Sequence, residues 1–394
     1  MTAGRAESGG ACGRILVAAR SSPQRQRLTR QLARQGHSVE ALEPARLEPE
    51  HLVVGHADLV LLEAEEGGDE VATCLNVLRG DERTRDLPVV VLAPHDADDL
   101  VSRCLELGAD DVLSLPVGAA VLRARVGGSL ESKRRRDRER READALEREV
   151  EVAQRIQRGF LPATLPSAEG LEMAALFRPA RQCSGDFYDA FPMPDGRLAL
   201  VVADVCDKGL GAALFMALFR SLLRATIEWG VRGVDHGEIL VRAVRRTSDY
   251  VARTHGDSNV FATAFVAAIE PATGRVAYVN AGHEPPAIVA GGAVRARLGR
   301  TAPAVGLAEG IEFAAGEATL APGELLFAYT DGLTEAKAAD GAFFGEKALL
   351  ALIAAPDESP AALLAGIEAE IDAYVGATAR HDDLTAVGVR RRRP

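Results

Sequence analysis

The sequence predicts two folded domains of different class, joined by a long helix. Residues 14–128 are expected to form a doubly wound α/β domain, residues 129–160 a helical linker, and residues 161–390 an α+β domain. Three observations lead to this division. Apolar runs alternate with helical patterns in the first zone, a charged stretch without Gly or Pro follows, and strand patterns flank helical ones in the last zone.

Short apolar runs in the first zone have the character of buried parallel strands. They read "RILVA", "ADLVLLE", "LPVVVLA" and "DDVLSLP", and helical patterns lie between and after them at about residues 23–35, 69–79, 97–107 and 117–128. Strands covered on both faces are apolar throughout, and helical crossovers join them in parallel. A doubly wound parallel sheet is therefore expected.

The linker is predicted to be one exposed helix with an apolar seam. Such a seam can pair with a second copy as a coiled coil, which would make a homodimer. A basic cluster, Lys133–Arg141, is interrupted by Asp137 and Glu139, which favours a salt-bridged, solvated helix over a nucleic-acid contact. The apolar positions recur at spacings of three and four: Leu146, Val150, Ala153, Ile156 or Gln157, and Phe160.

Strand patterns in the third zone occur before and after helical segments. "RLALVVA" precedes a helical middle at about residues 210–253, and "VFATAFVAAIE", "GRVAYVNAGH" and "ELLFAYT" follow it. A helical pair at about residues 345–375 and the run "LTAVGVR" complete the zone. This order indicates a layered α+β domain, large enough for one substantial core.

The composition indicates a folded protein, and the net charge disfavours polyanionic partners. With 47% hydrophobic and 26% charged residues over 394 positions, the chain has the composition of a folded protein with sizeable cores. The net charge of −11 argues against a general affinity for nucleic acid or anionic membranes, because a polyanion would be repelled on average.

Neither a membrane-spanning helix nor a secretory leader is expected. The longest apolar run, Ala212–Phe219, ends at Arg220, far short of the roughly 20 residues that a spanning helix needs. The N-terminal "MTAGRAESGGACGR" has no apolar core. The five cysteines are scattered, with no C-x-x-C pair, which predicts reduced thiols and a cytoplasmic protein.

Acidic residues of the third zone fall where predicted strands begin or end. Asp186 lies in "CSGDFYDAF", Asp204 ends "RLALVVA", Asp331 ends "ELLFAYT", and Asp382 and Asp383 precede "LTAVGVR". Any one of these residues, taken alone, can be explained as a turn former, because Asp is common in turns at strand ends. Together, carboxylates that converge without Lys or Arg partners repel each other and need a cation. Oxygen ligands without His or Cys suit Mg²⁺ or Mn²⁺ rather than zinc.

Two divalent ions on such a carboxylate set favour hydrolysis of a phosphate ester. They lower the pKa of a shared water and stabilise charge on a phosphoryl group, so no covalent enzyme intermediate is needed. The sequence has no G-x-x-x-x-G-K-[ST] phosphate loop and no G-x-S-x-G nucleophile elbow. Nucleotide-driven and serine-hydrolase chemistry therefore have no support.

Five motifs of the third zone carry a family resemblance. "CSGDFYDAF", "ADVCDKGLGAALFMA", "NAGHEPP", "YTDGLTEA" and "HDDLTAVGV" resemble, in order, the motifs of PPM-type metal-dependent serine/threonine phosphatases, in the bacterial RsbU-like and SpoIIE-like branch. The match spans about residues 146–390. The resemblance implies a sandwich of two antiparallel sheets flanked by helices, with a two-metal site (Mn²⁺ or Mg²⁺) at one end.

The resemblance also implies roles for particular residues. Asp186 matches the first acid of the family, and Asp204 matches the acid that bridges both metals, with the Val205 carbonyl as a further ligand. Asp331 matches the acid of the "DG" motif, and Asp382 matches the first acid of the "D-[DN]-x-T" motif. Because all four acidic positions are filled, a working enzyme is expected.

Other motif residues are given lesser roles. Ser184 stands where glycine is usual, and we expect little consequence because the residue remains small. Asp189 is expected to be structural or to support the ligands, and His283 to order a loop, with general-acid catalysis as the alternative. Lys208 and the glycines at 209 and 211 are expected to shape the turn into the next helix.

The first zone resembles a response-regulator receiver through "ADLVLLE", "RTRDLPVVVLA" and "LELGADDVLSLP", but departs from it where the chemistry lies. No Asp or Glu occurs between Ile15 and Val39 to hold Mg²⁺, and Glu63 stands at the phosphoacceptor position. Ala93 replaces the usual Thr or Ser, and Leu115 replaces the usual Lys. A pseudo-receiver that is not phosphorylated is expected, and Glu63 as a mimic of phosphoaspartate is a further hypothesis.

The leading functional hypothesis is a phosphoserine/phosphothreonine phosphatase whose pseudo-receiver and linker helix set its activity. The resemblance implies an anti-sigma-factor antagonist in a partner-switching pathway as the phosphorylated substrate. A second hypothesis is a weakly active or inactive scaffold that binds a phosphoprotein or an anti-sigma factor. A third is a nucleic-acid-binding regulator that uses the basic cluster Lys133–Arg141.

Overall fold

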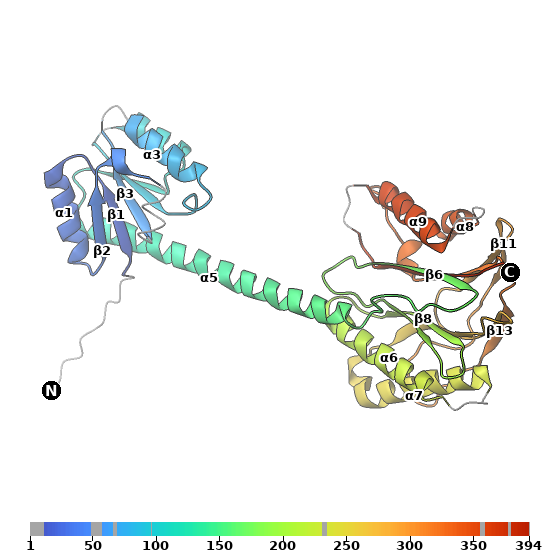
Figure 1. The fold of residues 1–394 in the computed structure, drawn as a ribbon. Helices are drawn as coiled ribbons and strands as arrows, with labels where there is room; N and C mark the ends of the chain where they lie inside the picture. Colours follow the sequence, from blue (N-terminus) through green and yellow to red (C-terminus); the bar gives the residue numbers. More distant parts are fainter. Residues whose placement is uncertain are drawn as a thin grey trace, which may run out of the picture. The chain divides into compact units, whose positions relative to one another are not determined.

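The computed structural model describes residues 12–48, 57–65, 69–95, 97–230, 235–354, 359–376 and 380–393. The chain divides into two compact units, Met1–Ala145 and Leu146–Pro394. Helix α5 (Ala119–Arg158) begins in the first unit and ends in the second (Figure 1).

The first unit is built on a parallel sheet. Over the described residues the strand order is β2-β1-β3-β4-β5, and every pairing is parallel. This order is that of flavodoxin-like doubly wound folds, so the predicted fold class is confirmed. The strands are β1 (Arg14–Ala18), β2 (Ser38–Leu42), β3 (Leu59–Glu63), β4 (Val89–Ala93) and β5 (Asp111–Ser114), and the helices are α1 (Ser22–Ala33), η1 (Pro44–Arg46), α3 (Asp69–Gly80) and α4 (Asp98–Glu106).

Two features of this unit differ from the sequence pattern. The edge strand β2, "SVEAL", is half-exposed and lacks the continuous apolar run that marks its neighbours, so the pattern missed it. The predicted helix at 117–128 and the predicted linker helix are one helix of 40 residues, α5. Leu122, Val126 and Leu130, spaced four apart, are buried in the same core cluster, which holds the helix together through Gly127 and Gly128.

The second unit contains two antiparallel sheets, with the strand orders β13-β10-β9-β8-β7 and β12-β11-β14-β15-β6 over the described residues. The first sheet consists of β7 (Phe187–Pro192), β8 (Leu198–Val205), β9 (Ala262–Ile269), β10 (Arg275–Ala281) and β13 (Gly316–Thr319). The second consists of β6 (Leu171–Arg178), β11 (Ala287–Ala290), β12 (Ala293–Arg297), β14 (Leu325–Tyr329) and β15 (Leu384–Arg391).

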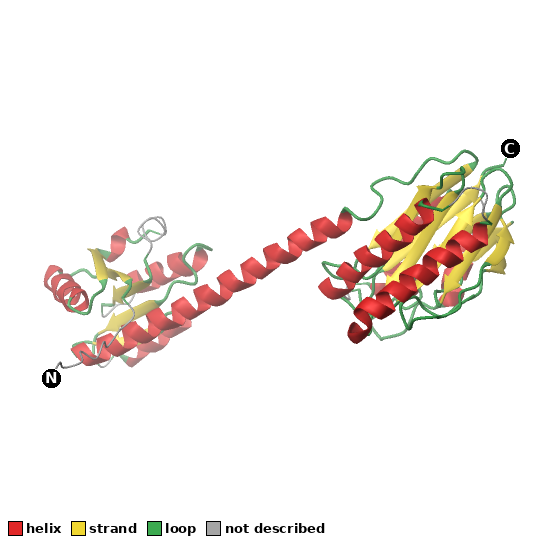
Figure 2. Cartoon of the chain, turned by 90° about the horizontal axis from the view of Figure 1, so that it is seen from below, coloured by secondary structure: helices red, strands yellow, loops and turns green. Residues whose placement is uncertain are grey.

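The two sheets pack face to face, with helices on both outer faces (Figure 1), and Figure 2 shows two helices lying over one of these faces. Apolar side chains of both sheets, among them Leu200, Phe265 and Leu326, form the core between them. Helices α6 (Leu210–Glu228) and α7 (His236–His255) cover the first sheet, and α8 (Glu346–Ile353) and α9 (Pro360–Val375) cover the second. Short 3-10 turns, η2 (Gly256–Ser258) and η3 (Asp331–Leu333), follow α7 and β14. The predicted flanked sandwich is confirmed.

Helix α6 bears on the expectation that no helix spans a membrane, which stays a prediction. By length and composition alone it is apolar enough to cross a membrane, although its longest uninterrupted apolar run is short. Within the second unit its inner face contributes to the core beneath the first sheet. The buried side chains of this face are Ala212, Ala213, Met216, Phe219, Leu223 and Ile227.

Candidate active site

The first sheet brings Asp186 and Asp204 to the same edge. Asp204 lies near the end of β8, and Asp186 directly precedes β7. In this antiparallel pair Phe187 is opposite Ala203, so Asp186 and Asp204 face each other one position further along. Asp186 and Asp204, at the two open ends of the β7–β8 hairpin, thus become neighbours.

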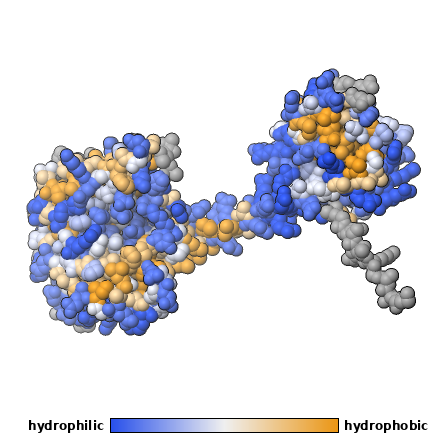
Figure 3. Space-filling model, turned by 180° about the vertical axis from the view of Figure 1, so that it is seen from behind, coloured by the Kyte–Doolittle hydropathy of each residue, from blue (hydrophilic) through white to orange (hydrophobic). Residues whose placement is uncertain are grey.

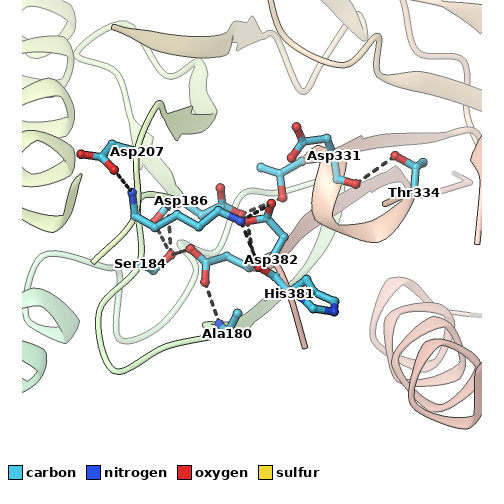
Figure 4. Close-up of polar contacts among 11 residues, drawn as sticks. Ala180, Ser184, Asp186, Asp207, Asp331, Thr334, His381 and Asp382 are labelled. Atoms are coloured by element: carbon cyan, nitrogen blue, oxygen red, sulfur yellow. Dashed lines mark hydrogen bonds and ion pairs between the residues drawn. The ribbon is translucent and has the colours of Figure 1, made fainter. Parts of the chain in front are cut away.

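The second sheet brings Asp331 and Asp382 to one edge in the same way. Asp331 follows β14, and Asp382 precedes β15, its antiparallel neighbour. The Thr330 amide donates to the Thr385 carbonyl at 3.0 Å, which continues the pairing beyond the two strands. The Thr330 hydroxyl donates to Asp186 Oδ2 at 2.7 Å and so joins this edge to the first sheet. Figure 4 shows Asp186, Asp331 and Asp382 gathered in one region.

Two glycines allow these segments to approach each other. A Cβ at Gly185 would lie 2.7 Å from the Val205 carbonyl oxygen, and a Cβ at Gly332 would lie 1.9 Å from the Asp383 carbonyl oxygen. Both distances are too short for any larger residue. The Val205 carbonyl, expected to be a metal ligand, therefore lies against the residue that precedes Asp186.

Burial and, to a lesser extent, mutual repulsion raise the pKa values of these acids. Burial raises the pKa of Asp204 to about 7, with repulsion by Asp331 and Asp382 as further causes. Burial also raises the pKa of Asp186 well above its usual value, and the charge of Asp204 raises it further. For Asp331, burial and the nearby Asp382 raise the pKa to about 6. Carboxylates held together at this cost are suited to a cation.

The donor set fits hard divalent ions in its chemistry. The side chains are carboxylates, and the Val205 carbonyl lies beside them. Among the described residues, no three acidic, histidine or cysteine side chains converge tightly enough to enclose an ion by themselves. Mg²⁺ commonly binds through one or two carboxylates and keeps several waters, so such an open arrangement remains compatible with it.

Lys208 has a contact that the sequence pattern did not predict. Its ammonium group donates to Asp382 Oδ2 at 2.7 Å and to the His381 carbonyl at 2.9 Å (Figure 4). Lys208 was expected only to shape the turn before α6. It also connects that turn to the segment that precedes β15 of the second sheet. Gly209, at a φ of 87°, lies in the turn directly before helix α6, as expected.

Ser184 corrects another expectation. The residue is fully buried, and its hydroxyl donates to Asp383 Oδ2 at 2.6 Å and accepts from the Asp186 amide at 3.0 Å. Asp383 had been given no role of its own. Since glycine could make neither side-chain contact, the substitution at this motif position has structural consequences.

Asp189 takes part in an ion network with two arginines. It is buried and pairs with Arg220 at 2.9 Å and with Arg224 at 3.1 Å, both on α6. Burial raises its pKa, and the two guanidinium groups oppose that shift. Asp189 thus ties helix α6 to strand β7.

His283 is held inside its loop. Its Nδ1 lies 2.8 Å from the Thr263 hydroxyl, and its amide donates to Asn280 Oδ1 at 2.9 Å. Burial lowers the pKa of His283 to about 3, so the imidazole is neutral near neutral pH. These contacts favour loop ordering over proton donation.

The predicted apolar seam of α5 is exposed at Leu146 and Ile156 but buried at the end of the helix. Leu146 and Ile156 are 62% and 60% exposed, and apolar surface is visible along the helix in Figure 3. Gln157, in contrast, is buried, and Phe160 packs against the core beneath the first sheet. Within the basic cluster, Lys133 pairs with Asp137 at 2.5 Å.

In the first unit, the altered receiver positions lie at the carboxyl ends of parallel strands. Glu63 ends β3, Ala93 ends β4, and Leu115 follows β5. Burial raises the pKa of Glu63, while the Arg20 and Ser21 amides stabilise its charged form. This edge is where doubly wound folds place their sites.

The fold and the gathered carboxylates together define the class: a PPM-type phosphatase unit that follows a receiver-like unit. The chain belongs to the family described as Stage II sporulation protein E (SpoIIE), whose model matches residues 194–392. The matched stretch contains Asp204, Asp331 and Asp382, and it begins after Asp186.

Similar proteins cover both units. Protein IcfG of Synechocystis sp. is 39% identical over 62% of this chain and 41% of its own length. Phosphoserine phosphatase RsbU of Bacillus subtilis is 26% identical over 50% of this chain and 56% of its own length. The chain thus spans about half the length of these two curated relatives. Response regulator PleD of Caulobacter vibrioides is 30% identical over 32% of this chain and 27% of its own length.

A solved structure supports the fold of the second unit. The SiaA-PP2C domain of Pseudomonas aeruginosa matches 63% of this chain and 98% of its own with a TM-score of 0.54, at 22% identity. At this identity the match concerns the fold alone.

Proposed function

We propose that this chain is a metal-dependent protein phosphatase that hydrolyses phosphoserine or phosphothreonine on a regulatory protein. The observation that carries the proposal is the convergence of Asp186, Asp204, Asp331 and Asp382 from both sheets, with the pKa of Asp204 raised to about 7 by burial and by its acidic neighbours. Similarity to a phosphoserine phosphatase, RsbU, points to the same activity.

Asp186, Asp204, Asp331, Asp382 and the Val205 carbonyl would hold two ions, Mn²⁺ or Mg²⁺. When bound, the ions supply Lewis acidity, which activates a water and offsets charge on the phosphoryl oxygens. Neighbouring polar residues of this chain hold the carboxylates in position and adjust their charge. Thr330 holds Asp186 at 2.7 Å, and the Lys208 ammonium neutralises part of the charge at Asp382.

The substrate we propose is a phosphorylated anti-sigma-factor antagonist of a partner-switching pathway. Its support is similarity alone: the motifs resemble the RsbU-like branch, and RsbU is a relative. Cytoplasmic action is part of the proposal, and its support is the cysteine pattern of the sequence, which has five scattered cysteines and no C-x-x-C pair.

We propose that the first unit and α5 regulate the phosphatase activity. Glu63, Ala93 and Leu115 occupy the positions where a receiver carries its phosphorylation chemistry, so we propose control by contact or dimerisation. The exposed apolar side chains Leu146, Val152 and Ile156 on α5 support pairing of two copies through this helix.

Two variants test the activity. Asp204→Asn and Asp331→Asn should abolish Mn²⁺-dependent dephosphorylation of a phosphorylated antagonist protein, while thermal unfolding shows that both variants fold. Unchanged turnover in both variants would refute the two-metal assignment. A calorimetric titration that detects no Mn²⁺ or Mg²⁺ binding to the unmodified chain would favour the inactive scaffold.

A further inference from the structure

The last turn of α5 contains a glutamine that is buried while its helix neighbours are exposed. Gln157 is 6% exposed, whereas Ile156 beside it is 60% exposed. Burying an amide side chain is costly unless its polar atoms are hydrogen-bonded. The contacts of Gln157 therefore identify what this turn holds in place.

Both polar atoms of the Gln157 amide bind one residue of the active-site loop. Nε2 donates to the Ser184 carbonyl at 2.5 Å, and Oε1 accepts from the Ser184 amide at 3.1 Å. This paired contact resembles the exchange between opposite residues of an antiparallel ladder. It holds the backbone of Ser184, two residues before Asp186.

The Ser184 side chain continues the connection into the carboxylate cluster. Its hydroxyl donates to Asp383 Oδ2 at 2.6 Å and accepts from the Asp186 amide at 3.0 Å. Asp383 Oδ1 accepts from the Ala180 amide at 2.7 Å, so the loop 180–186 is held at its beginning and near its end (Figure 4). The segment that carries Asp186 thus depends on α5 and on the residue next to Asp382.

We propose that Gln157 and Ser184 are positioning residues for the phosphatase reaction. They hold loop 180–186 so that the Asp186 carboxylate points toward Asp204 and the second sheet. Neither residue is expected to touch the substrate. This inference rests on the proposed function, because it assigns the two residues to the metal site of that reaction.

Gly185 makes the position of this loop sensitive to small displacements. A Cβ added at Gly185 would lie 2.7 Å from the Val205 carbonyl oxygen, so the loop passes directly against the end of β8. A shift of the Ser184 backbone would therefore move Asp186 relative to both Asp204 and Val205. Loss of a residue that supports a metal ligand typically lowers metal affinity or activity by about 10- to 100-fold.

The test uses the full chain and the substitution Gln157→Met, which keeps the length of the side chain and removes both hydrogen-bonding groups. Gln154→Met, one turn earlier on α5, is the matched control. Mn²⁺ affinity is measured by calorimetry, and kcat and KM with p-nitrophenyl phosphate. We expect Gln157→Met to lower Mn²⁺ affinity and kcat by about 10- to 100-fold with KM nearly unchanged, and Gln154→Met to match the unmodified chain.

Ser184→Gly tests the side-chain part of the connection and does not depend on the Gln157 variant folding. It should lower Mn²⁺ affinity and kcat in the same direction. Combined with Gln157→Met, it should cost less than the sum of the two separate effects, because both residues act on one loop.

The inference is overturned if either variant keeps the Mn²⁺ affinity and kcat of the unmodified chain, or if only KM or the thermal midpoint changes. Failure of the proposed function is distinguishable, because the unmodified chain itself would then neither bind Mn²⁺ nor hydrolyse the ester.

Discussion

The Thr330 hydroxyl donates a 2.7 Å hydrogen bond to Asp186 Oδ2, although 144 positions separate the two residues. Thr330 follows β14 of the second sheet, and Asp186 precedes β7 of the first. Both residues are buried, and the Thr330 hydroxyl also accepts from the Thr385 amide at 3.3 Å. The orientation of Asp186 therefore depends on the packing of both sheets.

Thr330→Val should weaken metal binding, because Val has nearly the same shape as Thr but cannot donate to Asp186. We expect Mn²⁺ affinity to fall by about 10- to 100-fold and the free energy of unfolding to fall by about 1–3 kcal/mol. Calorimetric titration and urea denaturation measure the two effects. Thr226→Val is the control, because the Thr226 hydroxyl donates to the Leu222 carbonyl of its own helix. An unaltered Mn²⁺ affinity in Thr330→Val would contradict the prediction.

The metal-free protein should lose stability from Asp204 and Asp331 as pH rises. Their pKa values are raised to about 7 and about 6, so the folded state binds these protons more tightly than the unfolded state. The contribution is present below about pH 4, the usual carboxyl range, and is lost as pH rises through about 6 to 7.

A comparison with Asp204→Asn isolates this effect. His283, whose pKa is lowered to about 3, destabilises the fold as pH falls below about 6.5, but it does so in both proteins. Between pH 5 and 8 in EDTA, the free energy of unfolding of the unmodified chain should decline relative to that of Asp204→Asn. Saturating Mn²⁺ should reduce the decline in the unmodified chain. A free-energy difference between the two proteins that stays constant over this pH range would contradict the prediction, because it would show that Asp204 is ionised throughout.

Asp189→Ala should destabilise the second unit without affecting metal binding. It leaves Arg220, whose side chain is 14% exposed, without its partner, and breaking a buried pair commonly costs about 3–5 kcal/mol. Urea denaturation should show that loss, while calorimetry should show unaltered Mn²⁺ affinity. Glu228→Ala, which removes a more exposed pair with Arg224, is the control and should cost under about 1 kcal/mol. A large loss of Mn²⁺ affinity in Asp189→Ala would contradict the prediction and show that Asp189 supports the metal ligands.

Lys208→Met should strengthen metal binding. The ammonium group lies 2.7 Å from Asp382, so a cation at this carboxylate must displace it or share the oxygen with it. The pair is partly exposed, which keeps the effect moderate, and we expect roughly a tenfold gain in Mn²⁺ affinity, or about 1.4 kcal/mol. Lys337→Met, which removes a lysine that stacks on Phe343, is the control. Weaker Mn²⁺ binding in Lys208→Met would mean that the ammonium group supports the metal site.

The first unit should resist phosphorylation by a small-molecule donor. Glu63 ends β3 where the acceptor would stand, and Ala93 and Leu115 occupy the positions of the hydroxyl and the lysine. Incubation with acetyl phosphate and Mg²⁺ should leave the mass of the chain unchanged. Glu63→Asp should also stay unmodified, since the other groups are still missing. A gain of one phosphoryl group in the unmodified chain would refute the pseudo-receiver hypothesis.

Local sequence patterns were enough to predict the classes of both units and to single out the candidate metal ligands. Continuous apolar runs separated by helical patterns indicate a doubly wound sheet, and Asp204 and Asp331 stand out because each ends an apolar strand. These signals are local, so they can be detected without knowing which strands pair. Short or half-exposed strands, such as β2 and β12 (Ala293–Arg297), carry a weaker local signal and were missed.

The polar residues that connect to the candidate site could be identified only from the folded chain. Gln157, Ser184, Thr330 and Lys208 have no local pattern that marks them, since each finds its partner in a distant part of the chain. A hydroxyl or an amide can hydrogen-bond to a candidate metal ligand or lie exposed on the surface. Which of the two occurs depends on strand register, sheet packing and burial, and these are set only when distant segments pack together. Ser184 is the clearest case: in the sequence it is a small residue in place of glycine, and in the folded protein it connects Asp186 to Asp383.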